Sequence, residues 1–389
     1  MPTYPDTSRA VSEIRGSIFT ALAEKLRAFQ GEVYPLHVGD TWLEPVEGAR
    51  MEDLRIAELP GMHRYSQPEG LPRLVDLLAA RATATTGVEH ERRSVLVTTG
   101  ATGALGAILG ALLHPGDEVL LLAPYWPLIE GIVRAFHGVP VDVPFFGHAE
   151  SAETAIECLE PHLHERTAAI YLNTPNNPTG RVIPRPWLEA IVEWAQRHRL
   201  WIVADEVYED LVYDGEHTWC RSLACDRTFS AHSFSKGWAM AGNRCGWVLG
   251  PARHMAELRK VGTHTFYAAP TASQLAGCRL LEGDRARAWL EAARTMYREL
   301  GGYAAARLGV EPPAGSTFLF LDVAPALDER GLAGFLLDCG ERGVFVAPGP
   351  SFGPYPTHIR ICFTAAPPEV TRRGIDVLAG LLGRSAVAP

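Results

Sequence analysis

The sequence predicts an α/β protein, in which a large domain with a mainly parallel sheet between helices is joined to a smaller α+β domain. Two patterns support this fold class. Short apolar runs alternate with helical patterns over residues 94–249, and a second, shorter series of strands and helices begins beyond residue 308. The apolar share of 47% is enough to bury a large core. The length of 389 residues is too great for one simple layer of secondary structure.

The elements of the large domain follow from the spacing of apolar residues. An amphipathic helix is expected over residues 11–29, where Gly31 ends it, and another over residues 70–86. Six runs rich in Val, Ile and Leu are typical of strands buried on both faces of a parallel sheet. These strands are expected at residues 94–98, 118–122, 168–172, 201–204, 228–232 and 246–249, and the alternating helices at 102–113, 127–136 and 185–198.

The pattern changes after a long helix expected over residues 284–308. Three strands and two helices follow, which is typical of a small α+β unit. The strands are expected at 317–322, 344–346 and 358–363, and the helices at 327–342 and 368–382. The predicted division is therefore a large domain of residues 45–283 and a small domain of residues 1–44 and 284–389.

Composition excludes several classes of function. The formal net charge is -9 and no Lys/Arg run exceeds a pair, which argues against a nucleic-acid partner. The longest apolar stretch, residues 104–113, is about half a membrane span, and acids and prolines precede any apolar run at the N-terminus. The seven cysteines form no CxxC pair, and His162 and His164 have no third ligand at a suitable spacing. We therefore expect a cytoplasmic protein with reduced thiols, no metal site and no membrane contact.

Lysine is rare in this chain, which makes each lysine informative. Of the 36 basic residues only three are lysines, Lys25, Lys236 and Lys260. Lys25 and Lys260 lie beside acids in amphipathic patterns and are expected to be solvated helix positions. Lys236 has no acid nearby in the sequence, and lysine cannot be replaced by arginine where a neutral amine must form an imine.

Polar residues gather where four of the predicted strands end, and the carboxyl ends of strands are where open α/β sheets bind ligands. They are the small residues of 98–103, the amide-rich run 173–180, Asp205, and Lys236 within 233–236. Each has a plain alternative. The first two can be ordinary turns, and Asp205 can be a helix N-cap.

Taken together, these motifs resemble those of class I/II aminotransferases, the fold-type-I enzymes that depend on pyridoxal 5'-phosphate. The resemblance is carried by Asn-Pro-Thr-Gly at 177–180, Asp-Glu-Val-Tyr at 205–208, Ser-Phe-Ser-Lys at 233–236 with Arg244, and Arg360. It extends from about Gly39 to the C-terminal helix. It implies a seven-stranded sheet, pyridoxal phosphate, an amino acid and a 2-oxo acid as substrates, and a homodimer with shared active sites.

The resemblance also assigns roles to individual residues. Lys236 would form a Schiff base with the cofactor and then act as general acid and base. Asp205 would keep the pyridine nitrogen protonated, while Asn177 and Tyr208 would bond the phenolic oxygen of the ring. Trp126 would stack on the ring, although packing in the interior is its plain alternative. The phosphate would be held by the backbone at Ala101 and Thr102, by Ser233, Ser235 and Arg244, and by Tyr65 of the other subunit.

The residues expected to bind the substrate match the family less completely than those expected to bind the cofactor. Arg360 would clamp the α-carboxylate with its guanidinium fork, next to the backbone of Gly39 and to Asn177. Thr102 stands where many aspartate-type relatives have a lysine that reads a distal carboxylate, and Trp42 places an indole near the substrate entrance. Aspartate is therefore in doubt as the substrate, and an aromatic, apolar or unusual side chain is equally compatible.

Other reactions remain open on the same scaffold. Elimination, cyclisation and oxidation of an amino acid use the same cofactor, because fold does not settle reaction. A transcriptional regulator built on this fold would need a DNA-binding domain before the first helix, where only about ten residues are present. Transamination is the leading reading.

Overall fold

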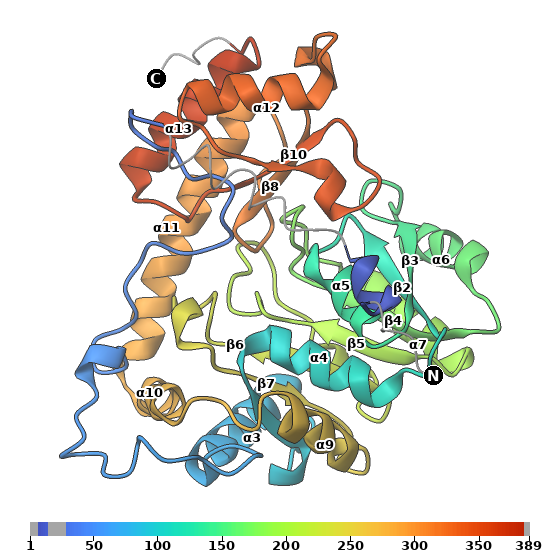
Figure 1. Ribbon diagram of the computed structural model, residues 1–389, viewed down its shortest axis with the longest axis vertical. Coiled ribbons are helices and arrows are strands. Elements are labelled where there is room, and N and C mark those ends of the chain that lie inside the picture. Colours follow the sequence, from blue (N-terminus) through green and yellow to red (C-terminus); the bar gives the residue numbers. More distant parts are fainter. Residues whose placement is uncertain (1–6, 15–28, 385–389) are drawn as a thin grey trace, which may run out of the picture.

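The computed structural model describes residues 7–14 and 29–384, and its centre is a seven-stranded sheet (Figure 1). The strand order is β1-β7-β6-β5-β4-β2-β3. The strands are β1 (Val95–Thr98), β2 (Glu118–Ala123), β3 (Val139–Pro144), β4 (Thr167–Asn173), β5 (Trp201–Asp205), β6 (Thr228–Ser233) and β7 (Gly246–Leu249). The sheet is parallel except at β7, which runs antiparallel to both neighbours. The predicted fold class is thus confirmed.

The register of the central strands sets up the site. Strands β4, β5 and β6 are adjacent and parallel, with Asn173 opposite Asp205 and Asp205 opposite Ala231. Because parallel strands end at the same edge, the polar residues at these three carboxyl ends are brought together.

Helices cover both faces of this sheet. One face packs against α4 (Gly100–Leu112), α5 (Leu128–Ala135) and α9 (Met255–Thr265). The other packs against α3 (Pro72–Thr86), α6 (Ala152–Leu159), α7 (Arg185–Arg197) and α10 (Thr271–Glu282), with the short α8 (Cys220–Leu223) nearby. Within the described residues, no helix is both long and apolar enough to cross a membrane.

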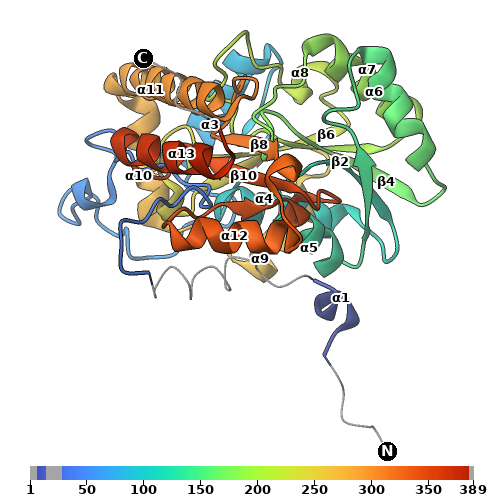
Figure 2. The same cartoon turned by 90° about the horizontal axis from the view of Figure 1, so that it is seen from above.

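A second, three-stranded antiparallel sheet has the order β8-β10-β9. Its strands are β8 (Phe318–Asp322), β9 (Ala347–Pro348) and β10 (His358–Cys362), and its helices are α11 (Arg285–Leu308), α12 (Gly331–Glu341) and α13 (Pro368–Leu381). Helix α11 links the two units, because Trp289 near its start packs against the cores of both. Figure 2 shows α11, α12 and α13 around this smaller sheet, whereas α1 (Arg9–Ser12) lies apart, beside α5.

Two differences from the sequence analysis concern strands, and one expected helix is largely untested. The helix expected over 11–29 falls mostly outside the described residues, and α1 (Arg9–Ser12) includes its first two positions. The strand expected at 344–346 is wrong: Val344 donates to the carbonyl of Cys339, Phe345 donates to that of Tyr34 in the N-terminal segment, and the strand β9 begins only at Ala347. Strand β3 was not expected, since its prolines argue against a strand; it lies at the edge of the sheet, where proline is tolerated.

Candidate active site

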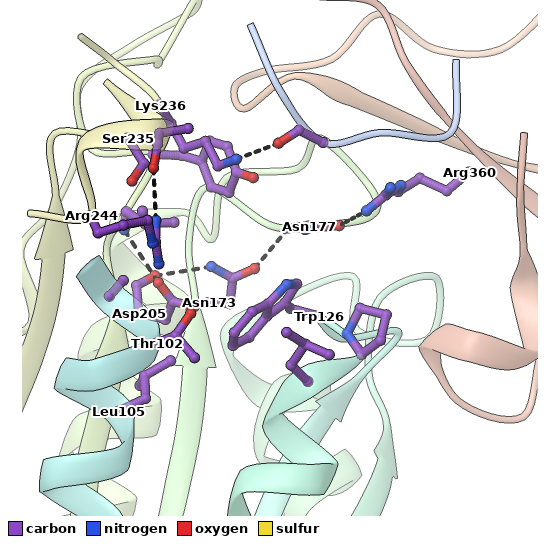
Figure 3. A pocket seen from close by; sticks show the side chains of 17 residues that line it. Thr102, Leu105, Trp126, Asn173, Asn177, Asp205, Ser235, Lys236, Arg244 and Arg360 are labelled. Atoms are coloured by element: carbon purple, nitrogen blue, oxygen red, sulfur yellow. Dashed lines mark hydrogen bonds between the residues drawn. The ribbon is translucent and has the colours of Figure 1, made fainter. Parts of the chain in front are cut away.

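A cavity of about 330 Å³ lies at the carboxyl ends of the central strands, between the large sheet and β10 (Figure 3). This volume is within the range of small-molecule sites. The structure brings eleven of the fourteen predicted site residues to its wall: Gly39, Ala101, Thr102, Trp126, Asn177, Asp205, Tyr208, Ser235, Lys236, Arg244 and Arg360.

Lys236 follows β6 and projects into this cavity. Its Nζ donates a hydrogen bond to the carbonyl of Gly39, which comes from the N-terminal segment. Burial lowers the pKa of Lys236, and this outweighs the opposing charge of Asp40. A lowered pKa makes the neutral amine accessible, which is the form that can attack a carbonyl.

Gly39 is required at its position by close packing. A Cβ at residue 39 would lie 2.9 Å from Cζ of Phe318 and 3.9 Å from Nη1 of Arg360. Since Phe318 is fully buried, its ring has little room to move away. The backbone of residue 39 can therefore approach Lys236 and Arg360 only as glycine.

Asp205 ends the central strand of the sheet and is only 3% exposed. Its Oδ2 accepts a hydrogen bond of 2.7 Å from the Tyr171 hydroxyl, and its Oδ1 a long one of 3.4 Å from the backbone of Val207. Burial raises the pKa of Asp205 to about 6, although the bond from Tyr171 opposes this rise. A cation placed beside this carboxylate would relieve the cost of its burial.

Arg360 reaches the cavity from β10. Its Nη1 donates to Oδ1 of Asn177 at 3.0 Å and its Nη2 to the carbonyl of His37 at 2.6 Å, while the guanidinium lies over the rings of Phe318 and Phe352. The side chain is 3% exposed and contacts no carboxylate among the described residues. Burial lowers its pKa to about 10, so the guanidinium is still charged at neutral pH. A buried cation without a counter-charge is suited to bind an anionic ligand.

Tyr208 and Trp126 form two further walls. Tyr208 is buried, packs edge to face against Phe318, and has its pKa raised by burial, so it remains a hydroxyl donor. Trp126 is partly exposed and borders the cavity just before α5. An indole in this place offers a flat apolar face to a ring.

The N-terminus of α4 supplies an anion site. Gly100 begins the helix with φ at 73°, and a Cβ there would lie 2.7 Å from Nη2 of Arg244. The first N–H groups of a helix have no partner within it and attract anions. Among the described residues, Arg244 donates hydrogen bonds only to the backbone carbonyls of Ala241 and Thr99. Ser235 also lines the cavity, and its hydroxyl lies 2.7 Å from that of Ser233.

These groups fit pyridoxal phosphate. A buried amine with a lowered pKa, a buried carboxylate, a helix N-terminus beside an arginine that is bonded to backbone carbonyls, and a partly exposed indole surround one cavity. Each matches one part of the cofactor, namely the aldehyde, the pyridine nitrogen, the phosphate and the ring.

Three predicted residues do not line the cavity. Ser233 lies behind Ser235 and bonds the carbonyl of Cys245. Trp42 is anchored through its backbone to Thr364, and its Nε1 is buried without a described partner. Tyr65 is 87% exposed and packs edge to face on Tyr267 at 5.0 Å, so it contributes nothing to the cavity of its own chain.

The structure shows roles for Asn173 and Tyr171 that the sequence did not predict. Asn173 bridges two motifs, because its Nδ2 donates to the carbonyl of Asp205 and its Oδ1 accepts from the backbone of Asn177. Tyr171 bonds the Asp205 carboxylate, as described above. The alternation of β4 places Tyr171 and Asn173 on one face, and this was the available signal. The apolar wall contains Leu105, Pro127, Leu128, Val207 and Ala241.

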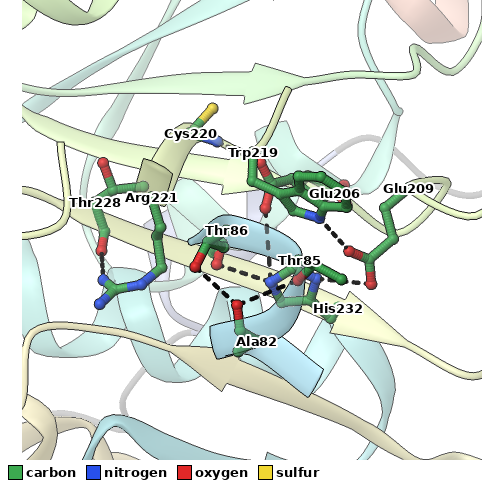
Figure 4. A network of polar contacts seen from close by, with 12 residues as sticks. Ala82, Thr85, Thr86, Glu206, Glu209, Trp219, Cys220, Arg221, Thr228 and His232 are labelled. Atoms are coloured by element: carbon green, nitrogen blue, oxygen red, sulfur yellow. Dashed lines mark hydrogen bonds and ion pairs between the residues drawn. The ribbon is translucent and has the colours of Figure 1, made fainter. Parts of the chain in front are cut away.

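A network of buried polar side chains includes Glu206, the residue that follows Asp205 in the chain (Figure 4). Nδ1 of His232 is 3.2 Å from Oε1 of Glu209, and its Nε2 is 3.6 Å from Oε2 of Glu206. Trp219 donates to the other oxygen of Glu209 at 2.6 Å. Burial opposes the charge on both His232 and Glu209, but their mutual attraction prevails: the pKa of His232 is raised and that of Glu209 lowered. Both shifts favour an imidazolium–carboxylate pair.

Comparisons with known proteins agree with this geometry. Residues 32–378 match the family model of class I and II aminotransferases. The chain is 33% identical to the aspartate/prephenate aminotransferase of Thermus thermophilus, over 97% of this chain and 99% of the relative. It is 35% identical to the arginine–pyruvate transaminase of Pseudomonas aeruginosa, over 92% and 93%. Among solved structures, the aspartate aminotransferase of Thermus thermophilus with maleate superposes with a TM-score of 0.87 at 30% identity, covering 97% of this chain and all of that one.

Proposed function

The chain belongs to the class I and II aminotransferase family and depends on pyridoxal phosphate. We propose that its amino donor is an amino acid with an apolar or aromatic side chain. The reaction moves an amino group between an amino acid and a 2-oxo acid. The main support for the proposed active site is that Lys236, Asp205 and Arg360 line the same cavity.

Each of these residues has a separate task in the proposed mechanism. When bound, pyridoxal phosphate withdraws electrons from the substrate α-carbon. Lys236 would hold the cofactor, and its amine would move the proton at that carbon. Asp205 would supply the negative charge that keeps the ring nitrogen protonated, and Arg360 would bind the substrate carboxylate with the amide of Asn177 beside it. Tyr208 would serve as a hydroxyl donor to the phenolic oxygen of the ring.

The charges around the cavity support an uncharged donor side chain. Among the described residues that line it, the cations are Lys236, Arg244 and Arg360. The proposed mechanism uses all three, for the imine, the phosphate and the α-carboxylate. The apolar part of the lining includes Leu105, Trp126, Pro127 and Leu128.

Aspartate is the competing donor, since several relatives are named for it. A distal carboxylate would need a cation, and Thr102, which is exposed at the cavity wall, offers only a hydroxyl. A buried carboxylate without a charged partner is costly, so the described residues favour an apolar side chain over an acidic one.

The test compares donors by kcat/KM with one fixed 2-oxo acid. We expect leucine, methionine or phenylalanine to exceed aspartate in the wild type. Thr102→Lys should then raise the ratio of aspartate to phenylalanine by about 10-fold or more, the worth of one charge-assisted hydrogen bond. Thr102→Gln is the matched control, since it adds length without charge and should leave that ratio near the wild-type value. A wild type that prefers aspartate would overturn the proposed substrate class while leaving the transaminase assignment in place.

We further infer a homodimer with shared active sites. Tyr65 is exposed, packs against Tyr267 and lies outside the cavity of its own chain, as expected of a residue that reaches the phosphate site of a second copy. We also infer that residues 1–44 and 284–389 act as a small domain that closes over residues 45–283. Seven cysteines without a disulfide support a cytoplasmic location.

A further inference from the structure

Tyr171 lies one strand away from Asp205 and is 1% exposed. The register of β4 and β5 pairs Tyr171 with Val203 and Asn173 with Asp205, so Tyr171 and Asp205 are diagonal neighbours on one face of the sheet. The phenol ring packs in the core beneath α4, and its hydroxyl donates to Oδ2 of Asp205 at 2.7 Å. Tyr171 itself does not line the cavity.

The carboxylate of Asp205 has few other partners. Its remaining hydrogen bond, from the backbone of Val207 to Oδ1, is long at 3.4 Å. Two further ionisable groups act on it from neighbouring elements: His232 favours its charge and Glu206 disfavours it. Tyr171 is the strongest donor to this carboxylate among the described residues, and it stays a donor, because burial and the charge of Asp205 raise its pKa well above 10.

We propose that Tyr171 is a positioning residue, which holds Oδ2 of Asp205 so that Oδ1 remains available to the protonated ring nitrogen of the cofactor. The inference rests on the proposed role of Asp205. A carboxylate fixed at one oxygen cannot rotate, and a hydrogen bond to its charged form keeps it ionised in spite of burial. Tyr171 would thus act on the cofactor through Asp205, without touching the reacting atoms.

The test measures binding to the apoprotein instead of turnover. The two probes are pyridoxal phosphate and its carbocyclic analogue, in which C–H replaces the ring nitrogen. The ratio of their dissociation constants reports the interaction between Asp205 and that nitrogen. Tyr171→Phe keeps the ring and removes the hydroxyl. Tyr125→Phe is the matched control, because Tyr125 is also buried and donates to an aspartate, Asp142 on the edge strand β3, at 2.8 Å.

We expect Tyr171→Phe to weaken binding of pyridoxal phosphate by roughly tenfold and to leave the analogue nearly unchanged, so that the ratio falls by the same factor. Tyr125→Phe should leave the ratio at the wild-type value. A merely structural role for Tyr171 would weaken both probes equally, and that outcome would overturn the proposal. If the wild type already fails to distinguish the two probes, the role of Asp205 itself is wrong, which is a separate failure.

A second measurement needs no cofactor. The C=O stretch of a protonated buried carboxyl can be followed against pH by infrared spectroscopy of the apoprotein, with Asp205→Asn to assign the band. Loss of the Tyr171 hydroxyl should raise the midpoint by about one to two pH units. Should Tyr171→Phe not fold, a fluorinated tyrosine at position 171 keeps the ring and strengthens the donor, and the midpoint should then fall. An unchanged midpoint in the folded variant contradicts the proposal.

Discussion

Replacing Arg360 by lysine should give the enzyme a pH dependence that the wild type lacks. Burial lowers the pKa of Arg360 from 12.5 to about 10. An equal fall from the ordinary lysine value of about 10.4 would bring Lys at this position to about 8. The variant would therefore lose its positive charge within the assay range, whereas arginine keeps it.

The size of the effect has two parts. An ammonium cannot form the bidentate pair with the substrate carboxylate, and one lost charge-assisted hydrogen bond of about 1.5–3 kcal/mol lowers kcat/KM by roughly 10- to 150-fold at pH 7. Deprotonation with a pKa near 8 then lowers it by about another tenfold between pH 7 and pH 9. The sign follows from lysine being charged below its pKa.

The assay is kcat/KM for the best amino donor between pH 6.5 and pH 9.5, expressed as the ratio of Arg360→Lys to wild type so that other titrations cancel. Arg373→Lys serves as the control, since Arg373 forms an exposed pair with Glu32 and should give a ratio near one at every pH. A flat ratio for Arg360→Lys, or one close to unity, would show that Arg360 does not bind the carboxylate.

Four further outcomes are expected. Borohydride reduction followed by mass spectrometry should find the cofactor on the peptide that contains Lys236, and cofactor bound elsewhere would refute the assignment. Asp205→Asn should retain cofactor but lose turnover on the order of 10²–10³-fold, since an amide cannot keep the ring nitrogen charged; near wild-type turnover would remove this role. Sedimentation should show a homodimer, and a fully active monomer would contradict the part assigned to Tyr65. Glu209→Gln should lower the free energy of unfolding by about 3–5 kcal/mol at neutral pH, because it removes the carboxylate nearest to the buried His232. The measurement is the difference in urea midpoint between wild type and variant as a function of pH. Because folding lowers the pKa of Glu209 from 4.5, this difference should shrink as the pH falls below 4.5. A difference that does not change with pH would count against the ion pair.

The residues at strand ends could be predicted from sequence because their chemistry is local. Lys236 stands out by its rarity, and Asp205 by following a buried strand directly. Arg360 alternates with Ile359 and Ile361 in β10, so its opposite orientation could be foreseen and agrees with its place at the cavity. In such cases one element determines where the side chain points.

Features that depend on two elements could not be predicted in the same way. The contact of Tyr171 with Asp205 requires the register between β4 and β5, which a single sequence does not specify. Residues 344–346 form no strand of the small sheet, and the one backbone partner of Phe345 among the described residues is Tyr34, some 310 positions earlier in the chain. Strand β3 was missed because only its edge position, a property of the whole sheet, makes its prolines acceptable.

The place of β5 in the middle of the seven-stranded sheet has a consequence for how this protein loses activity. Asp205, Asn173 and Ser233 end three adjacent strands, each paired on both sides. Such strands open only when the whole domain opens, so their amides should be the slowest to exchange with deuterium. The part of the site at these strand ends then has no local route to collapse, and it should be lost only with cooperative unfolding of the large sheet, whereas Gly39 and Arg360 lie on other elements.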